Sequence, residues 1–509
     1  MQPIFSRDYM FAWRLYFLDI LSSVVLFSGV SITADRVWRP PFEDEISTIF
    51  PSLPAAAEQS TLEFFRFYLN GGDVHPPLTF LFFSKLHYLG VSVPALRLCS
   101  LMLTAASLAL FQLLTLALLH RRNGGRVSLA TRWIGILLFG LSPLALSQGA
   151  AIRWYPLFAA CVALFFTLYM SAGSVVIRLA SAIPLGIAAS INLIAPIVVV
   201  PFIVYRYLLQ REYQVSFEIA YWVLFSSFGC LGIYTAVSLL HHGDPEILVD
   251  TGLFGHSILS ALAIDILGVF GGNAIGVGYA WVILPVATIC LLAMINEIDR
   301  ENPADPTHLF LLMFGAIALA VIVGFAEPRS FLYLAPVEAV ILTVFLDRQR
   351  DSGYALVLAA LVILPTATAI ANLNNSTHPF KRNAVAPFAE IVDFIKTNET
   401  GDSLVISTDP VILWLLRLDP HRCLSYFLEE ESCFVAPERY GSIFVVSGHS
   451  DKSSNVQLIQ HFEDMLAQIL AARHKAVEIH VGLDNDAKIK SRLTGVPLSR
   501  FILTIALYR

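Results

Sequence analysis

The feature that most constrains this chain is a series of long apolar segments that carry few charges. Eleven of them approach the length of a helix that crosses a bilayer, which needs about 20 mostly apolar residues. They cover residues 15–33, 94–119, 129–148, 154–171, 175–190, 192–209, 218–240, 277–295, 308–325, 331–346 and 354–371. Only 14% of the 509 residues are charged, against about 25% in a soluble domain. The sequence therefore predicts an α-helical polytopic membrane protein.

Two further apolar stretches, 76–90 and 257–272, are short and interrupted, and we expect interfacial or re-entrant helices there. Counting them as spans would raise the total to 13, but it would also move basic loops to the outside. The first segment is too long for a signal-peptide core and lacks a small-residue cleavage site, so we expect a retained helix. The chain is therefore predicted to cross the membrane eleven times.

The basic residues predict the sidedness, because Lys and Arg concentrate in cytoplasmic loops. With a cytoplasmic N-terminus, the inside receives Arg7, Arg14, Arg121, Arg122, Arg126, Arg178, Arg206, Arg211, Arg300, Arg348 and Arg350. The outside receives the acidic loop 34–93, the loops 149–153, 241–276 and 326–329, and everything after about residue 372.

The composition changes near residue 380. Residues 387–408 have the pattern of an amphipathic helix, a Gly-Asp turn and a buried strand. Strands are expected at 441–448, 476–482 and 501–508, with a helix at 455–474. We predict two domains, a transmembrane catalytic domain over 1–372 and a soluble periplasmic α/β domain over 373–509.

Cysteine usage fits this division. Cys99, Cys161, Cys230 and Cys290 fall in apolar segments, where cysteine acts as a small hydrophobe. Cys423 and Cys433 lie in a polar segment that we expect to be irregular. Because an outer domain folds in an oxidising compartment, we predict a disulfide between them. The net charge of −6 gives no reason to expect nucleic-acid binding.

The loop after the first apolar segment carries the most specific pattern. It holds the acids Glu43, Asp44 and Glu45, followed by 72-GDVHPPLTFLFFSKLHYLGVSVPALRLCS-100. The order of an acidic pair, His-Pro-Pro-Leu, a short helix, Gly and Arg-Leu-x-Ser resembles polyprenyl-phosphate-sugar glycosyltransferases with the GT-C fold. It looks most like the bacterial group related to protein O-mannosyltransferases, the aminoarabinose lipid A transferase and rhizobial lipopolysaccharide galacturonosyltransferases.

Two later segments are similar to the same family. Residues 153-RWYPLF-158 resemble its Arg-x-Tyr at the top of a span, and 328-PRSFLYLAPVEA-339 resembles its Arg-Tyr-Leu-x-Pro-x-x-Pro segment. Ser330 and Phe331 depart from the usual tyrosine position. The resemblance implies a GT-C fold of about 11 transmembrane helices in a bacterial inner membrane.

The resemblance also implies site roles. Asp44 matches the family's catalytic base, and Glu45 its partner; Glu43 leaves the register of this pair open by one position. The chemistry of the residues agrees, because a sugar on a lipid phosphate has a good leaving group and needs chiefly a base and fixed positive charge. The outer loops supply the positive or donor groups His75, Lys85, Arg97, Arg153 and Arg329. A single displacement inverts the anomeric configuration, and the sequence offers no second carboxylate nucleophile.

Other interpretations stay open at this point. His75 could cap the short helix, Lys85 could snorkel from it, and Arg97 could anchor a membrane edge. The acids 43–45 with His75 could hold a divalent cation, but the mannosyltransferase-like branch does not generally require one, so we expect no metal and no cofactor. A membrane O-antigen ligase or polymerase, a transporter or a non-catalytic scaffold are the competing classes.

The partners implied are a polyprenyl-phosphate-linked hexose or pentose, the lipid bilayer and a membrane-associated acceptor. The acceptor stays open between lipopolysaccharide, another polysaccharide, a lipid and a protein.

Overall fold

The structure is a computed structural model of the whole chain. It describes residues 6–33, 78–171, 174–210, 214–242, 308–313, 316, 334–348, 388–407, 416, 423–425, 440–447, 464, 466–481 and 503–509. The chain divides into two compact units. The described residues up to 348 belong to the first unit, and those from 388 onward belong to the second.

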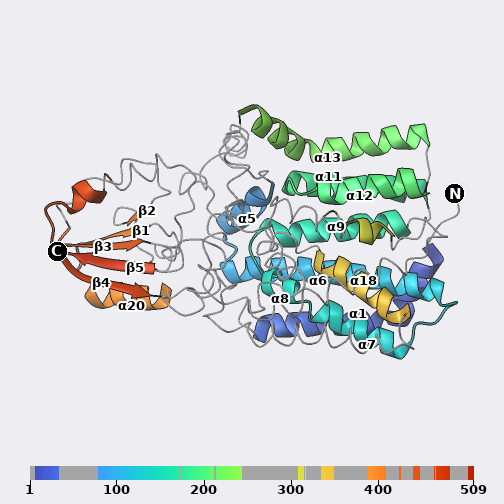
Figure 1. Cartoon of the computed structure of the whole chain (residues 1–509), viewed down its shortest axis with the longest axis horizontal. Coiled ribbons are helices and arrows are strands. Elements are labelled where there is room, and N and C mark those ends of the chain that lie inside the picture. The colour runs from blue at the N-terminus through green and yellow to red at the C-terminus, as the bar shows by residue number, and fades with distance from the viewer. Residues whose placement is uncertain are drawn as a thin grey trace, which may run out of the picture. The chain divides into compact units, whose positions relative to one another are not determined.

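The first unit is helical, and Figure 1 shows its long helices side by side with roughly parallel axes. Its helices are α1 (Ser6–Thr33), α5 (Leu78–Tyr88), α6 (Val93–Arg122), α7 (Leu129–Gly140), α8 (Pro143–Gln148), α9 (Trp154–Ser171), α10 (Val175–Ala180), α11 (Ala182–Ile191), α12 (Pro196–Val204), α13 (Val215–His242) and α18 (Leu334–Arg348). Within the described residues, three stretches are long and apolar enough to cross a bilayer: Ala12–Thr33, Val93–Arg122 and Val215–Val237. These long apolar helices are those of a helical membrane protein.

Three spans expected from the sequence, 129–148, 175–190 and 192–209, are interrupted. The first is divided into α7 and α8 at Pro143, which lacks a backbone N–H and disfavours a helical conformation in the residue before it. That residue, Ser142, has a ψ of 118°, outside the helical region. The last begins only at Pro196, after a turn in which the Asn192 side chain accepts a hydrogen bond from the backbone of Ile194 at 2.9 Å. It ends in a π-helical turn, Tyr205–Gln210.

Helices α6 and α9 run parallel. The Ser107 hydroxyl on α6 donates to the carbonyl oxygen of Ala159 on α9 at 3.2 Å. Further along both helices, the rings of Phe111 and Phe166 lie 5.7 Å apart. Because residue numbers rise together along the pair, α6 and α9 end on the same side of the unit.

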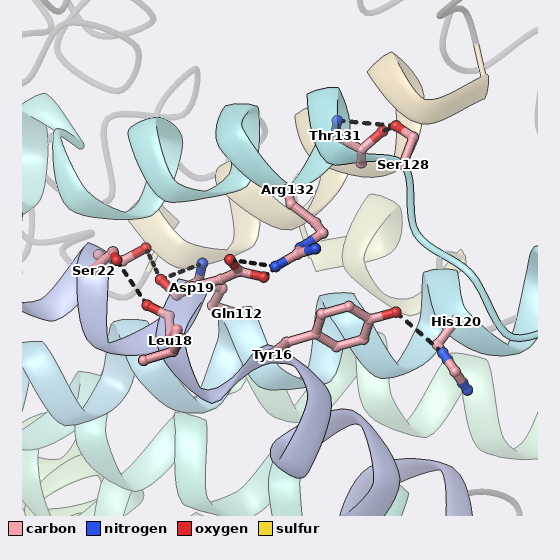
Figure 2. A network of polar contacts seen from close by, with 10 residues as sticks. Tyr16, Leu18, Asp19, Ser22, Gln112, His120, Ser128, Thr131 and Arg132 are labelled. Carbon is pink, nitrogen blue, oxygen red and sulfur yellow. Dashed lines mark hydrogen bonds and ion pairs between the residues drawn. The ribbon is translucent and has the colours of Figure 1, made fainter.

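A polar network joins the middle of α1 to the second half of α6 and the start of α7 (Figure 2). The Arg132 guanidinium donates two hydrogen bonds to the Asp19 carboxylate, at 2.6 and 2.9 Å. The Tyr16 hydroxyl and His120 Nδ1 are hydrogen-bonded at 3.2 Å, and Gln112 donates to the carbonyl oxygen of Asp19 at 3.4 Å. We call this side of the helical unit the inner end.

Two further carboxylates lie at the inner end. Asp347, near the end of α18, accepts hydrogen bonds of 2.7 Å from Asn123 and from the Thr131 hydroxyl. Glu218, near the start of α13, pairs with the buried Arg206, whose guanidinium carbon lies 5.9 Å from the ring centroid of Tyr169 near the end of α9. The helix ends that the sequence assigns to the cytoplasmic side are thus brought together, while the sidedness itself stays a prediction.

Small residues let α11 and α13 approach closely, as is common between helices in membranes. A methyl group placed on Gly232 would lie 1.9 Å from the carbonyl oxygen of Ala189, and one on Gly186 would lie 2.6 Å from that of Phe225. The Ser190 hydroxyl donates across the same interface to the Phe228 carbonyl oxygen at 2.7 Å.

The second unit contains a five-stranded sheet of order β2-β1-β3-β5-β4. Its elements are α20 (Phe388–Asn398), β1 (Ser403–Ser407), β2 (Cys423–Ser425), β3 (Ser442–Ser447), β4 (Lys475–Val481) and β5 (Leu503–Tyr508). β1 pairs in parallel with β2 and β3, and β5 pairs antiparallel with β3 and β4. The rings of Phe394 and Phe444, 6.3 Å apart, show that α20 packs on the sheet.

The strands expected at 441–448, 476–482 and 501–508 are present as β3, β4 and β5. The expectation of an irregular segment at Cys423 is wrong, because this residue begins β2 and pairs with Val405 of β1. Cys433 lies outside the described residues, and the predicted disulfide stays untested. The placement of this unit on the outer side of the membrane is likewise a prediction.

Candidate functional site

Part of the predicted site falls within the described residues. Lys85, Arg97 and Arg153 are described, whereas Asp44, Glu45, His75 and Arg329 lie outside the described residues. The predicted roles of the second group therefore remain predictions. The three described residues can be placed relative to the helices that carry them.

Arg97 lies one turn into α6, at the end of the unit opposite the inner end, which we call the outer end. Its side chain is 0% exposed and is among the largest fully buried side chains of the described chain. Arginine stays charged in proteins, and a buried charge is costly unless polar or anionic groups surround it. This degree of burial argues against a simple membrane-edge anchor, since such a side chain would extend toward the interface.

The short helix α5 precedes α6 and carries Lys85 in its last turn. With 11 residues it is about 16 Å long, too short to span the bilayer, as the sequence predicted. A turn follows at Gly90, whose φ of +90° favours glycine. Ser92 then caps α6 by accepting from the backbone of Ala95 at 3.4 Å. Lys85 is half-buried and lies at the same end of α6 as Arg97.

Arg153 is on the short loop that joins α8 to α9. The loop is held by backbone hydrogen bonds from Gly149 to Ala145 (2.7 Å) and from Arg153 to Ala151 (2.9 Å). The guanidinium carbon of Arg153 lies 5.9 Å from the ring centroid of Tyr155, within the range of a cation–π interaction.

Gly149 fixes this loop against α1 and α6. The Thr104 hydroxyl donates to the Gly149 carbonyl oxygen at 2.8 Å. A methyl group placed on Gly149 would lie 2.8 Å from Phe27 Cζ and 2.9 Å from Thr104 Cγ2, so both side chains face the glycine. Arg97 is two turns outward from Thr104 on α6, and Arg153 is four residues beyond Gly149. The structure thus brings Arg97 and Arg153 to the same end of the helical unit.

Three polar side chains near the outer end were not selected from the sequence. The Ser31, Thr79 and Ser100 hydroxyls are buried, and no hydrogen-bond partner for them lies in the part of the chain that the structure describes. Ser100 is the serine of the Arg-Leu-x-Ser motif, which gave a signal for it. No sequence motif pointed to Ser31 or Thr79, because only the structure shows that their hydroxyls are unpaired among the described residues.

The charged residues of the inner end were also missed, although Asp19 and Glu218 interrupt apolar segments. Both carboxylates are paired with arginine, and they lie at the opposite end of the helices from Arg97. They hold the helix ends together and are not part of the outer-end site.

Within the described residues, no group of three His, Cys, Asp or Glu side chains is placed to hold a metal ion. The acids at 43–45 and His75 lie outside those residues, so the expectation of no metal stays untested.

No protein-family model and no curated protein matches the chain. Among solved structures it is similar to the crystal structure of ArnT from Cupriavidus metallidurans bound to undecaprenyl phosphate. The two share 15% sequence identity at a TM-score of 0.45, over 95% of this chain and 97% of that one.

Proposed function

We propose that the chain is an inverting glycosyltransferase of the GT-C type. It moves a hexose or pentose from a polyprenyl-phosphate donor to an acceptor of the cell envelope, at the periplasmic surface of the bacterial inner membrane. The acceptor is a lipopolysaccharide, another polysaccharide, a lipid or a protein.

The observation that carries this proposal is the complete burial of Arg97 at the outer end of the helices. Arg97 follows the loop with the acidic triplet and His-Pro-Pro-Leu after the short helix α5. The Thr104–Gly149 hydrogen bond ties the helix of Arg97 to the loop of Arg153. Two permanent cations at one end of a membrane bundle suit a ligand with a phosphate headgroup and a lipid tail. Arginine favours this role because its guanidinium binds phosphate oxygens in a bidentate fashion.

In the proposed reaction, the acceptor hydroxyl attacks the anomeric carbon of the sugar. Asp44 takes the hydroxyl proton while the bond between the sugar and the phosphate oxygen breaks, and Glu45 orients Asp44 or contacts the acceptor. The electron pair of the broken bond stays on the lipid phosphate, where Arg97, Arg153 and Arg329 stabilise the charge. Lys85 and His75 complete the donor-binding groups.

The main alternative is a membrane O-antigen ligase or polymerase, which would share lipid-linked substrates but would not need the early acidic loop. A transporter or scaffold would need no catalytic carboxylate at all. Mass spectrometry of envelope glycans from cells with and without the protein tests the proposal. A single sugar missing from one envelope component supports it, and identical glycans in both strains would exclude it.

A further inference from the structure

Two buried hydroxyls at the outer end, those of Ser31 and Ser100, lack a contact that many serines and threonines of the described helices make. Serine and threonine in helices commonly donate to the carbonyl oxygen four residues earlier. Ser22, Ser23, Thr33, Thr104, Thr115, Ser227, Thr235 and Thr343 all do so. Ser31 of α1 and Ser100 of α6 are 1% and 0% exposed, yet neither hydroxyl has a hydrogen-bond partner among the described residues.

The two serines occupy equivalent places on their helices. Phe27 and Thr104 face Gly149 from α1 and α6, and residues four apart lie on the same face of a helix. Ser31 is four residues beyond Phe27 toward the outer end, and Ser100 is four residues before Thr104 in the same direction. Both hydroxyls therefore lie about one turn, roughly 6 Å, outward of the Gly149 contact.

The cationic side chains of Arg97 and Arg153 belong to the same end of the helical unit as Ser31 and Ser100. Arg97 precedes Ser100 by three residues and so shares a face of α6 with it. Arg153 lies on the loop that leaves Gly149. An unpaired buried hydroxyl is unfavourable, and such groups in native proteins call for an explanation such as a catalytic role or a bound water or ion.

We infer that Ser31 and Ser100 donate hydrogen bonds to phosphate oxygens of the polyprenyl-phosphate donor, between α1, α6 and the 149–153 loop. The inference rests on the proposed function, and it adds two neutral donors to the arginines. The hydroxyls position the phosphate, whose oxygens are the partners that both hydroxyls lack among the described residues.

The test is a binding titration of the full-length protein in detergent, with undecaprenyl phosphate as the probe and undecaprenol as the ligand that lacks the phosphate. The variants are Ser31→Ala and Ser100→Ala. The control is Thr115→Val, which removes a buried α6 hydroxyl that already has a partner, the Phe111 carbonyl oxygen at 2.8 Å.

Each serine variant is expected to bind undecaprenyl phosphate about tenfold more weakly, the loss of one hydrogen bond to a charged group. Binding of undecaprenol stays unchanged in these variants. The thermal midpoint of the ligand-free serine variants stays the same or rises, because an unpaired buried hydroxyl has been removed. Thr115→Val is expected to retain the wild-type affinity for undecaprenyl phosphate.

Wild-type protein that does not prefer undecaprenyl phosphate over undecaprenol would overturn both this inference and the proposed donor. Wild-type preference that both serine variants retain would overturn the inference and leave the proposed function standing. Serine variants with a lower thermal midpoint and unchanged affinity would show that the hydroxyls are structural.

Discussion

The hydroxyl of Thr104 donates a 2.8 Å hydrogen bond to the carbonyl oxygen of Gly149 and so fastens the loop of Arg153 to the helix of Arg97. These residues are 45 positions apart in the sequence. The contact requires glycine, because a side chain at this position would meet Phe27 as well as Thr104. The spacing of the two arginines therefore depends on the absence of a Cβ at residue 149.

Gly149→Val is expected to push the loop away from α6 and to reduce sugar transfer by at least about tenfold, since small displacements of binding groups are costly to catalysis. Transfer by membranes of equal protein content is the measurement. Gly29→Ala in α1 is the control, because a methyl group there meets nothing within 4 Å. Equal loss in both variants would mean that Gly149 has no special role.

A second glycine pair tests the packing of α11 on α13. A methyl group on Gly232 would lie 1.9 Å from a backbone oxygen of α11, whereas one on Gly229 would be no closer than 3.5 Å to any atom. Gly232→Ala is expected to lower the free energy of unfolding by about 1–3 kcal/mol, and Gly229→Ala to leave it nearly unchanged. The measurement is the thermal unfolding midpoint of the two variants in detergent. Equal midpoints would refute the close approach of α11 and α13 at Gly232.

The sequence predicted the helices of the first unit well where apolar runs are uninterrupted, as in α6 and α13. It also placed the strands β3, β4 and β5. It missed the break at Pro143, because the apolar run continues on both sides of the proline. It missed β2, because three residues are too few to show the alternation of apolar and polar side chains that is typical of a strand.

The polar contacts were beyond sequence reasoning for a different reason. Asp19 and Arg132 are 113 positions apart, and nothing local to either residue reveals the pairing. The same holds for Ser31, whose lack of a partner depends on how α1 and α6 are packed. Arg97 could be selected because its motif resembles a known family and because a leaving phosphate needs positive charge on the outer side.

The pair of Asp19 and Arg132 should stabilise the inner end without taking part in transfer. Asp19→Asn is expected to lower the free energy of unfolding by about 2 kcal/mol, less than the roughly 3–5 kcal/mol of a fully buried pair. The double variant with Arg132→Gln should lose less than the sum of the single losses. All three variants are expected to keep the wild-type turnover well below their unfolding temperatures. If the losses of unfolding free energy in the two single variants simply add in the double variant, the pairing is contradicted.

The predicted disulfide between Cys423 and Cys433 provides a test of the sidedness. If the second unit folds in the periplasm, the two thiols should be oxidised, with a stabilisation of about 2–3 kcal/mol for a short loop. Thiol labelling of denatured protein, with and without prior reduction, measures this state. Two free thiols in protein from native membranes would count against the bridge and against the outward placement.

Asp44 is proposed as the base of a sugar transfer from a lipid phosphate. The most direct measurement is mass spectrometry of envelope glycans from cells that lack the protein, complemented with wild type, Asp44→Asn or Glu45→Gln at equal membrane abundance. Wild type should restore the missing sugar, and Asp44→Asn should restore less than about 1% of it, the scale of a lost general base. Full restoration of the sugar by Asp44→Asn would contradict the role of Asp44 as the base. If only Glu45→Gln fails to restore the sugar, Glu45 is the base instead.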